Sequence, residues 1–112
     1  MQIYKRDGSI ENFNKEKIIR AINKAFLEVD GILYETDTAE DIADAIERFV
    51  GLNNHPVPIE KIQDRIEDYL MRSERPDVAR AYIRYRYKRE MVRSYTNDMI
   101  ESISEKLEAK NV

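Results

Sequence analysis

The sequence contains no cysteine and no tryptophan, and it has only three glycines, three prolines and one histidine. The missing cysteine excludes disulfides, thiolate zinc sites and thiol catalysis within this chain. Charged residues make up 37% and hydrophobic residues 42%, which is typical of a folded, helix-rich domain. No apolar run approaches the roughly 18 residues of a membrane span, and no signal-peptide pattern opens the chain. We therefore expect one cytoplasmic domain, for which 112 residues provide a sufficient core.

The familiar catalytic patterns are missing as well. With one histidine and no cysteine, the chain has no Ser-His-Asp set and no spacing of metal ligands. It also lacks the glycine-rich loop that binds phosphates through backbone N–H groups. Catalysis within this chain is not expected, and any phosphate group would have to be bound by side-chain cations.

The charge is unevenly distributed along the chain. The net charge is −3, but residues 72–93 hold eight cations against three acids, so this segment carries +5 and the remainder −8. A general nucleic-acid binder is usually basic over its whole domain. An acidic chain with one basic helix instead favours a focused site for an anion.

The first thirteen residues predict a β-hairpin. Asp7-Gly8 is a strong turn signal, and the flanking residues 2–4 and 9–13 are rich in strand-forming types. A two-residue Asp-Gly loop would pair Lys5 with Ile10. A loop of odd length would instead place Ile3, Lys5, Glu11 and Phe13 on one face, as an apolar patch beside a cation and a carboxylate. Such a face could hold a purine and a phosphate, and the sequence leaves both registers open.

The rest of the chain predicts helices with apolar residues at helical spacing. Asn14 is a good N-cap for a helix over 15–29, and Thr38 begins a capping-box-like start of a second helix. Pro56 and Pro58 favour an extended segment that could add a short strand. The expected further segments are a third helix over 59–72, a fourth from Pro76 to about Val92 or beyond, and an amphipathic segment over 94–112. The predicted fold is mostly helical α+β, with an N-terminal β-hairpin capping a small four-helix bundle.

The fourth helix carries the candidate anion site. At about 100° per residue, one face collects the apolar residues, and Arg89 projects into the middle of it with Arg86 on its shoulder. A guanidinium on an apolar face needs a partner, so part of this face is expected to be polar. Either these arginines pair with acids such as Glu11 or Asp41, or they meet a bound anion. The predicted core face consists of Val78, Ala81, Tyr82, Tyr85 and Val92, and the predicted solvated face of Arg80, Arg84 and Lys88.

Two stretches of the sequence resemble a known family. Residues 3–22 contain the pattern Ile3-x-Lys5-Arg6-Asp7-Gly8-x-x-Glu11-x-Phe13-Asn14-x-x-Lys17, followed by Ile18, Ala21 and Ile22. Residues 78–89 read Val-Ala-Arg-Ala-Tyr-Ile-x-Tyr-Arg-x-x-Arg. Together these closely resemble the ATP-cone, the nucleotide-sensing domain of ribonucleotide reductases, and residues 99–112 are similar to the segment that follows the cone in anaerobic (class III) ribonucleoside-triphosphate reductases.

The resemblance implies allosteric control of overall reductase activity, with ATP permitting turnover and dATP inhibiting it, each bound with Mg²⁺. It implies that Ile3 covers the base, that Lys5, Arg6 and Lys17 engage phosphates, and that Glu11 and Asn14 contact the base or sugar. Arg86 and Arg89 match last-helix positions near the phosphates, and Thr38 matches a helix start that contributes to the pocket.

The resemblance also implies the organisation of the chain. Residues 1–93 would form the cone and 94–112 a helical linker toward a catalytic domain of the same chain, with oligomer contacts in the full-length enzyme and no nucleic-acid or membrane partner. The end of the sequence suggests an N-terminal piece of a longer enzyme. The alternatives are a cone of an aerobic reductase, the reductase-gene repressor, which carries a zinc ribbon before its cone, or a helical module that binds an acidic partner or nucleic acid.

Overall fold

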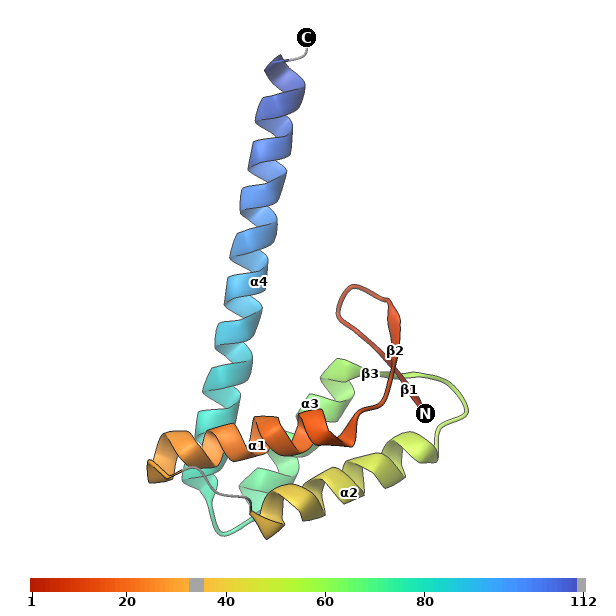
Figure 1. Cartoon of the computed structure of the whole chain (residues 1–112), viewed down its shortest axis with the longest axis vertical. Coiled ribbons are helices and arrows are strands. Elements are labelled where there is room, and N and C mark those ends of the chain that lie inside the picture. Colours follow the sequence, from red (N-terminus) through yellow and green to blue (C-terminus); the bar gives the residue numbers. More distant parts are fainter. Residues whose placement is uncertain (33–35, 111–112) are drawn as a thin grey trace. The chain divides into compact units, whose positions relative to one another are not determined.

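The computed structural model describes residues 1–32 and 36–110, with the backbone alone at 97–98, 101–102 and 104–110. It forms two compact units, Met1–Tyr82 and Ile83–Val112, and each is described here by itself. The mostly helical α+β fold is confirmed (Figure 1). In chain order the elements are β1 (Gln2–Tyr4), β2 (Ile10–Asn12), α1 (Lys15–Asp30), α2 (Asp37–Gly51), β3 (Val57–Pro58), α3 (Ile59–Arg72) and α4 (Pro76–Lys110).

The hairpin adopts the odd-length loop. Ile3 pairs with Glu11 and Tyr4 with Ile10, so the loop between Lys5 and Ser9 has three residues. Gly8 closes a turn by donating its N–H to the Lys5 carbonyl at 3.0 Å, and its φ of 85° lies in the left-handed region that glycine tolerates. This is the three-residue loop in which a left-handed residue follows a turn. The register therefore places Ile3, Lys5, Glu11 and Phe13 on one face, the arrangement required by a nucleotide-facing hairpin.

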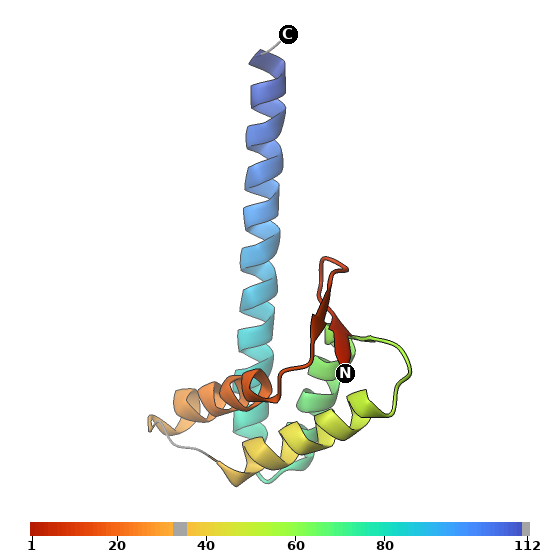
Figure 2. The same cartoon turned by 45° about the vertical axis from the view of Figure 1, so that its right-hand side comes forward.

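The extended segment before α3 adds a third strand. β3 pairs in parallel with β1, giving the sheet order β2-β1-β3. Figures 1 and 2 show the hairpin standing next to the short segment that leads into α3. A hairpin alone is marginal in water, and β3 together with the buried Ile3 fixes it to the helices.

The predicted cap of α1 is confirmed, whereas that of α2 is wrong. Asn14 Oδ1 accepts the Glu16 N–H at 3.0 Å, and Gly31 ends the helix in the left-handed conformation. At α2 the N-cap is Thr36, which has an extended backbone and whose side-chain Oγ1 accepts the Ala39 N–H at 3.0 Å. Thr38 is already helical, so it cannot be the cap. Thr36 is favoured as the N-cap because it is buried and also donates a hydrogen bond to Asn23 Oδ1 at 2.9 Å.

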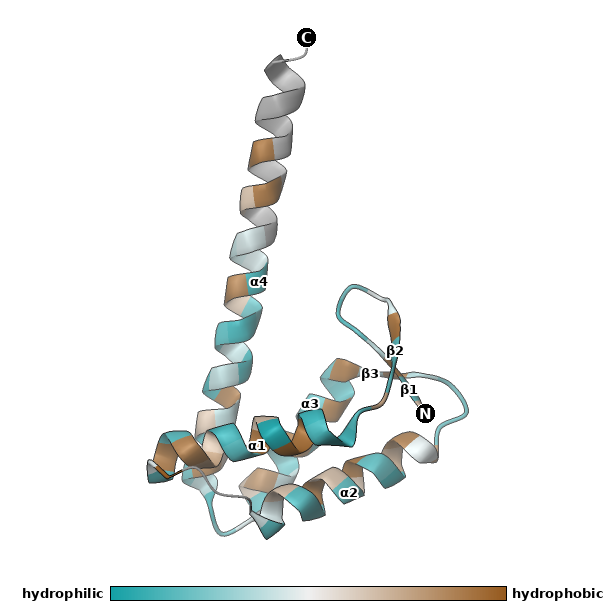
Figure 3. Ribbon diagram, in the orientation of Figure 1, coloured by the Kyte–Doolittle hydropathy of each residue, from teal (hydrophilic) through white to brown (hydrophobic). Residues whose placement is uncertain are grey.

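The core of the first unit is built from one face of each helix and from the sheet. Figure 3 shows hydrophobic residues alternating with hydrophilic ones along α1, α2 and α3. The sheet contributes Ile3 and Val57. On α2 the buried alanines are Ala39 and Ala43, whereas Ala45 is half-buried. The largest fully buried side chains are Ile22, Ile46, Ile62, Ile66, Leu70, Val57 and Val78.

The fourth helix differs from its prediction in length and in burial. It is one continuous helix, Pro76–Lys110, rather than two segments, and Pro76 begins it as predicted. Burial ends at Tyr82: Tyr85 is half-buried, Val92 is 64% exposed and Arg89 is exposed. The prediction that Val92 and Arg89 lie on a core face is therefore wrong. The helical spacing continues past Tyr82, but the buried stretch of the helix does not.

An arginine joins the two helix ends at the corner before α4. Arg75 Nη2 lies 2.6 Å from Asp30 Oδ1 at the end of α1, and Arg75 Nε lies 3.1 Å from Asp77 Oδ1 in the first turn of α4. These hydrogen bonds raise the pKa of Arg75 and lower that of Asp77. No helix among the described residues is long and apolar enough to cross a membrane.

Candidate functional site

The hairpin turn carries two of the predicted phosphate ligands, Lys5 and Arg6, on a loop closed by backbone hydrogen bonds. Lys5 is exposed, and its N–H donates to the Ser9 carbonyl at 2.8 Å. Asp7 faces its own turn, because its Oδ1 accepts the Ser9 hydroxyl at 2.6 Å and the Ser9 N–H at 2.9 Å. These hydrogen bonds lower the pKa of Asp7. The acid between the cations and Gly8 is thus used for turn formation.

Arg6 reaches from the hairpin to α3. Its Nη2 donates to Gln63 Oε1 at 2.8 Å, and its Nη1 lies 3.8 Å from Glu60 Oε1. Glu60 and Gln63 are three residues apart on α3, so they lie on one side of its first turns. The structure therefore brings the hairpin loop and the start of α3 together.

The start of α1 supplies the next group of predicted residues. Lys17 Nζ lies 3.9 Å from Glu11 Oε1, so a predicted phosphate ligand and a predicted base or sugar ligand are adjacent. Asn14 is committed through Oδ1 to capping α1. Lys15 pairs with Asp44 on α2, which raises the Lys15 pKa. A positive helix N-terminus and Lys17 thus lie directly after the hairpin strand that carries Glu11.

Ile3 and Thr38 have different surroundings. Ile3 is 5% exposed and belongs to the core, on the hairpin face that also carries Lys5 and Glu11. Thr38 is half-buried in the first turn of α2, and the Thr36–Asn23 hydrogen bond places that turn beside the middle of α1. Both assignments stay predictions.

The two arginines of the last helix belong to the second unit. Arg89 is exposed, and its Nη1 lies 3.3 Å from Tyr85 Oη, with the guanidinium 5.8 Å from the ring centre. Arg86 is half-buried. Glu11, one of the acids considered as a partner for them, pairs with Lys17. That Arg86 and Arg89 approach a nucleotide remains a prediction.

Sequence reasoning missed Glu60 and Gln63. Their residue types are ordinary for the first turns of a helix, and 57 positions separate Gln63 from Arg6. The only signal was the predicted short strand at 57–58, which places the start of α3 beside the hairpin once it pairs with β1.

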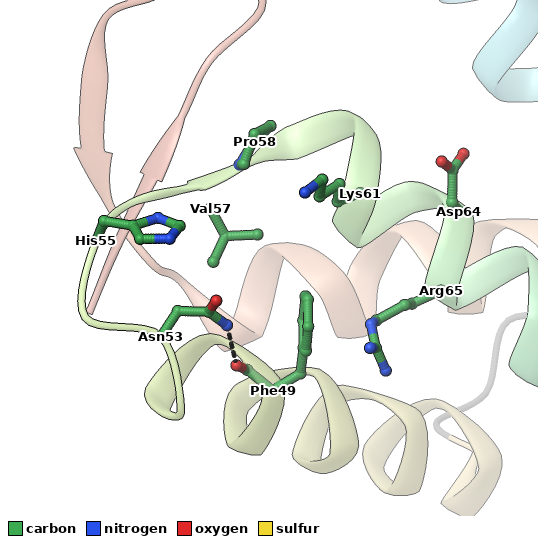
Figure 4. Close-up of a pocket in the computed structure, with 8 residues that line it drawn as sticks. All are labelled: Phe49, Asn53, His55, Val57, Pro58, Lys61, Asp64 and Arg65. Carbon is green, nitrogen blue, oxygen red and sulfur yellow. Dashed lines mark hydrogen bonds between the residues drawn. The ribbon is translucent and has the colours of Figure 1, made fainter.

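A pocket of about 320 Å³ lies between the end of α2, β3 and α3 (Figure 4). The Arg65 guanidinium stacks over the Phe49 ring at 3.6 Å from its centre, and Asn53 Nδ2 donates to the Phe49 carbonyl at 2.7 Å. None of the predicted nucleotide ligands lines it. Its lining consists of Phe49, Asn53, His55, Val57, Pro58, Lys61, Asp64 and Arg65.

Within the described part of the chain, no group of three histidine or acidic residues could hold a metal ion.

Comparison with known proteins identifies the class of this chain. A family model described as the ATP cone domain matches residues 1–91, so the chain belongs to the ATP-cone family, a domain that occurs in ribonucleotide reductases and is generally a nucleotide-binding regulatory domain. The resemblance seen in the sequence is thereby confirmed.

Individual relatives are all much longer proteins. The chain is 34% identical over 112 residues to an anaerobic ribonucleoside-triphosphate reductase of Haemophilus influenzae, which covers 98% of this chain and 15% of the relative. It is 33% identical to the anaerobic enzyme of Escherichia coli, covering 97% and 15%. It is 40% identical over 98 residues to a vitamin B12-dependent ribonucleoside-diphosphate reductase of Thermoplasma acidophilum, covering 82% and 12%. The chain thus spans about one seventh of the length of the anaerobic relatives.

Proposed function

We propose that this domain binds ATP or dATP and thereby sets the overall activity of a ribonucleotide reductase. The observation that supports the proposal is the hairpin register, which sets Lys5 on one face with Glu11, itself paired with Lys17 at the start of α1, while Arg6 follows Lys5 in the loop, all inside the matched region. Three cations and a helix N-terminus together suit a triphosphate. The domain itself is not a catalyst in this proposal.

The hairpin face supplies the rest of the nucleotide site in this proposal. Glu11 pairs with Ile3 across the hairpin, and its carboxylate lies 3.9 Å from Lys17 Nζ. This carboxylate can accept a hydrogen bond from an amino group or a hydroxyl of the nucleotide. Ile3 is buried beneath this face, so direct contact with a base requires the hairpin to shift. Asn14, Thr38, Arg86 and Arg89 complete the proposed set of ligands.

Discrimination between ATP and dATP rests on a single hydroxyl group. Contacts to one hydroxyl change affinity modestly, so the two effectors must favour different conformations or assemblies. The hairpin is suited to such a change, because its strands are short and Arg6, one of the proposed phosphate ligands, is among the groups that join it to α3. The conformational difference would then act on the catalytic domain of the same chain or on oligomer contacts.

The reductase is proposed to be the anaerobic, triphosphate-reducing type. Two anaerobic relatives match 97–98% of this chain, whereas the vitamin B12-dependent relative from Thermoplasma acidophilum matches 82% of it. In this proposal residues 1–93 form the sensing domain and 94–112 a helical linker, Mg²⁺ accompanies the triphosphate, and the protein acts in the cytoplasm.

Calorimetric titration of the chain with ATP and with dATP, each with Mg²⁺, tests the proposal. Saturable binding of both, with CTP as a matched triphosphate control that binds more weakly, supports a purine-nucleotide site. If neither effector binds below about 1 mM, an affinity of roughly 4 kcal/mol, the proposal fails.

A further inference from the structure

The second unit carries an apolar stripe that its own helix cannot bury. Val92, Tyr95, Met99 and Ile103 are 64%, 68%, 48% and 54% exposed. Their spacings of three, four and four residues keep them on one face of a nearly straight helix. Most of the stability of a helix in water comes from packing such a face, so this one is expected to find a partner.

The charges along the same helix suggest which partner. Residues 83–96 hold five cations and one acid, for a balance of +4, whereas residues 97–110 hold four acids and two cations, for −2. A second copy lying antiparallel would place the basic half of each helix against the acidic half of the other. A parallel copy would place the two +4 segments side by side, which like-charge repulsion opposes.

We propose that the C-terminal half of α4 pairs antiparallel with the same segment of a second copy of this chain. The stripe of Val92, Tyr95, Met99 and Ile103 forms the apolar centre, and the opposite charges of the two halves fix the direction. The pairing does not require a nucleotide, so it stands independently of the function proposed above.

Sedimentation equilibrium of the chain over a range of concentrations tests the pairing. The expected result is a monomer–dimer equilibrium that weakens as NaCl is raised from about 0.05 M to about 0.5 M, because salt screens exposed charges. A chain that stays monomeric up to about 1 mM at low salt overturns the proposal, because the pairing would then be too weak to matter. Larger assemblies without a dimer would also contradict a closed two-fold contact.

Two tyrosines provide a matched pair of variants. Tyr95 lies on the stripe and is 68% exposed, whereas Tyr87 is 62% exposed and lies eight residues earlier, about 80° around the helix and farther from the stripe. Tyr95→Glu should raise the dimer dissociation constant roughly tenfold or more, and Tyr87→Glu should leave it nearly unchanged. Equal effects would refute the stripe as the contact. Circular dichroism of both variants should show unchanged helix content, so that a change in dimerisation is not a loss of the helix.

The absence of native cysteine allows a direct test of direction. Centring the pair on the middle of the stripe, between residues 97 and 98, places Val92 of one copy opposite Ile103 of the other. Mixed Val92→Cys and Ile103→Cys chains should therefore form a disulfide heterodimer under oxidation, in excess of either homodimer. Predominant homodimers of both variants would indicate parallel pairing and overturn the proposal.

Discussion

Arg6 of the hairpin loop donates a hydrogen bond to Gln63 of α3 at 2.8 Å, across 57 residues of sequence. The same guanidinium lies 3.8 Å from Glu60 Oε1. A residue proposed to bind phosphate is thus already held by an amide and an acid of the first unit. In the proposed function, a triphosphate that recruits Arg6 must compete with both groups.

Removing the charge of Glu60 should therefore tighten nucleotide binding. In Glu60→Gln the size and the hydrogen-bonding capacity are kept, but the carboxylate no longer competes with phosphate for Arg6. The ion pair is partly exposed, so the expected gain in ATP affinity is roughly two- to fivefold. Calorimetric titration with Mg²⁺ and ATP measures it.

Asp68→Asn is the matched control for this prediction. Asp68 is an exposed acid on the same helix, so the substitution changes the net charge equally. Its ATP affinity should stay close to that of the unsubstituted chain. An equal gain in both variants would show that overall charge, rather than release of Arg6, sets the affinity.

The proposed phosphate ligands should differ from other cations of the chain. Lys5→Ala and Arg89→Ala should each weaken triphosphate binding about tenfold or more, because a charge-assisted hydrogen bond contributes about 1.5–3 kcal/mol. Arg84→Ala, which removes an exposed cation from the same helix as Arg89, should have a much smaller effect. Equal losses in all three variants, measured by titration, would indicate diffuse charge attraction instead of a site.

Much of the first unit could be predicted from local signals. The Asn14 cap, the bounds of α3 and the start of α4 at Pro76 each depend on neighbouring residues. The Thr36 cap could not be predicted from its neighbours, because Thr36 is favoured by burial and by a hydrogen bond to Asn23. Propensity and spacing carry no information on such distant partners.

In the candidate site, too, local signals could be predicted from the sequence whereas contacts between distant residues could not. The family pattern predicted Lys5, Arg6 and Lys17 as phosphate ligands, which stays a prediction, but the Arg6 contacts to Glu60 and Gln63 depend on β3 pairing with β1. The error on α4 has a related cause. Helical spacing shows which residues share a face, but it does not show where along the helix the core ends.

The contacts of Arg75 with Asp30 and Asp77 should make the stability of the fold depend on pH. Hydrogen bonds from Arg75 lower the pKa of Asp77, so the carboxylate stabilises the fold above the ordinary aspartate value of about 3.9. This contribution is lost as pH falls through the lowered pKa of the folded state. The free energy of unfolding, measured by denaturant titration between about pH 5 and about pH 2, should therefore decrease with acidification.

Asp77→Asn separates the contribution of Asp77 to the pH dependence of stability from the contributions of other acids. The variant should be less stable than the unsubstituted chain near neutral pH and should show a shallower loss of stability in acid. Some slope will remain, because hydrogen bonds from Ser9 also lower the pKa of Asp7. An unchanged slope would exclude Asp77 as a contributor.

The cap of α2 gives the sharpest test of the fold, because two threonines compete for the role. Thr36 is buried, accepts the Ala39 N–H at 3.0 Å and donates to Asn23 Oδ1 at 2.9 Å, whereas Thr38 is half-buried within the helix. Thr36→Ala removes the cap and leaves Asn23 without this partner. The expected cost is about 1–3 kcal/mol in the free energy of unfolding.

Thr36→Ser should restore most of this stability, because serine keeps the hydroxyl that caps the helix and reaches Asn23. Thr38→Ala should change stability by less than about 0.5 kcal/mol, since alanine is favoured inside a helix and the side chain caps nothing. Denaturant unfolding of the three variants measures the differences. A larger loss of stability in Thr38→Ala than in Thr36→Ala would indicate that Thr38, as the sequence pattern predicted, is the N-cap.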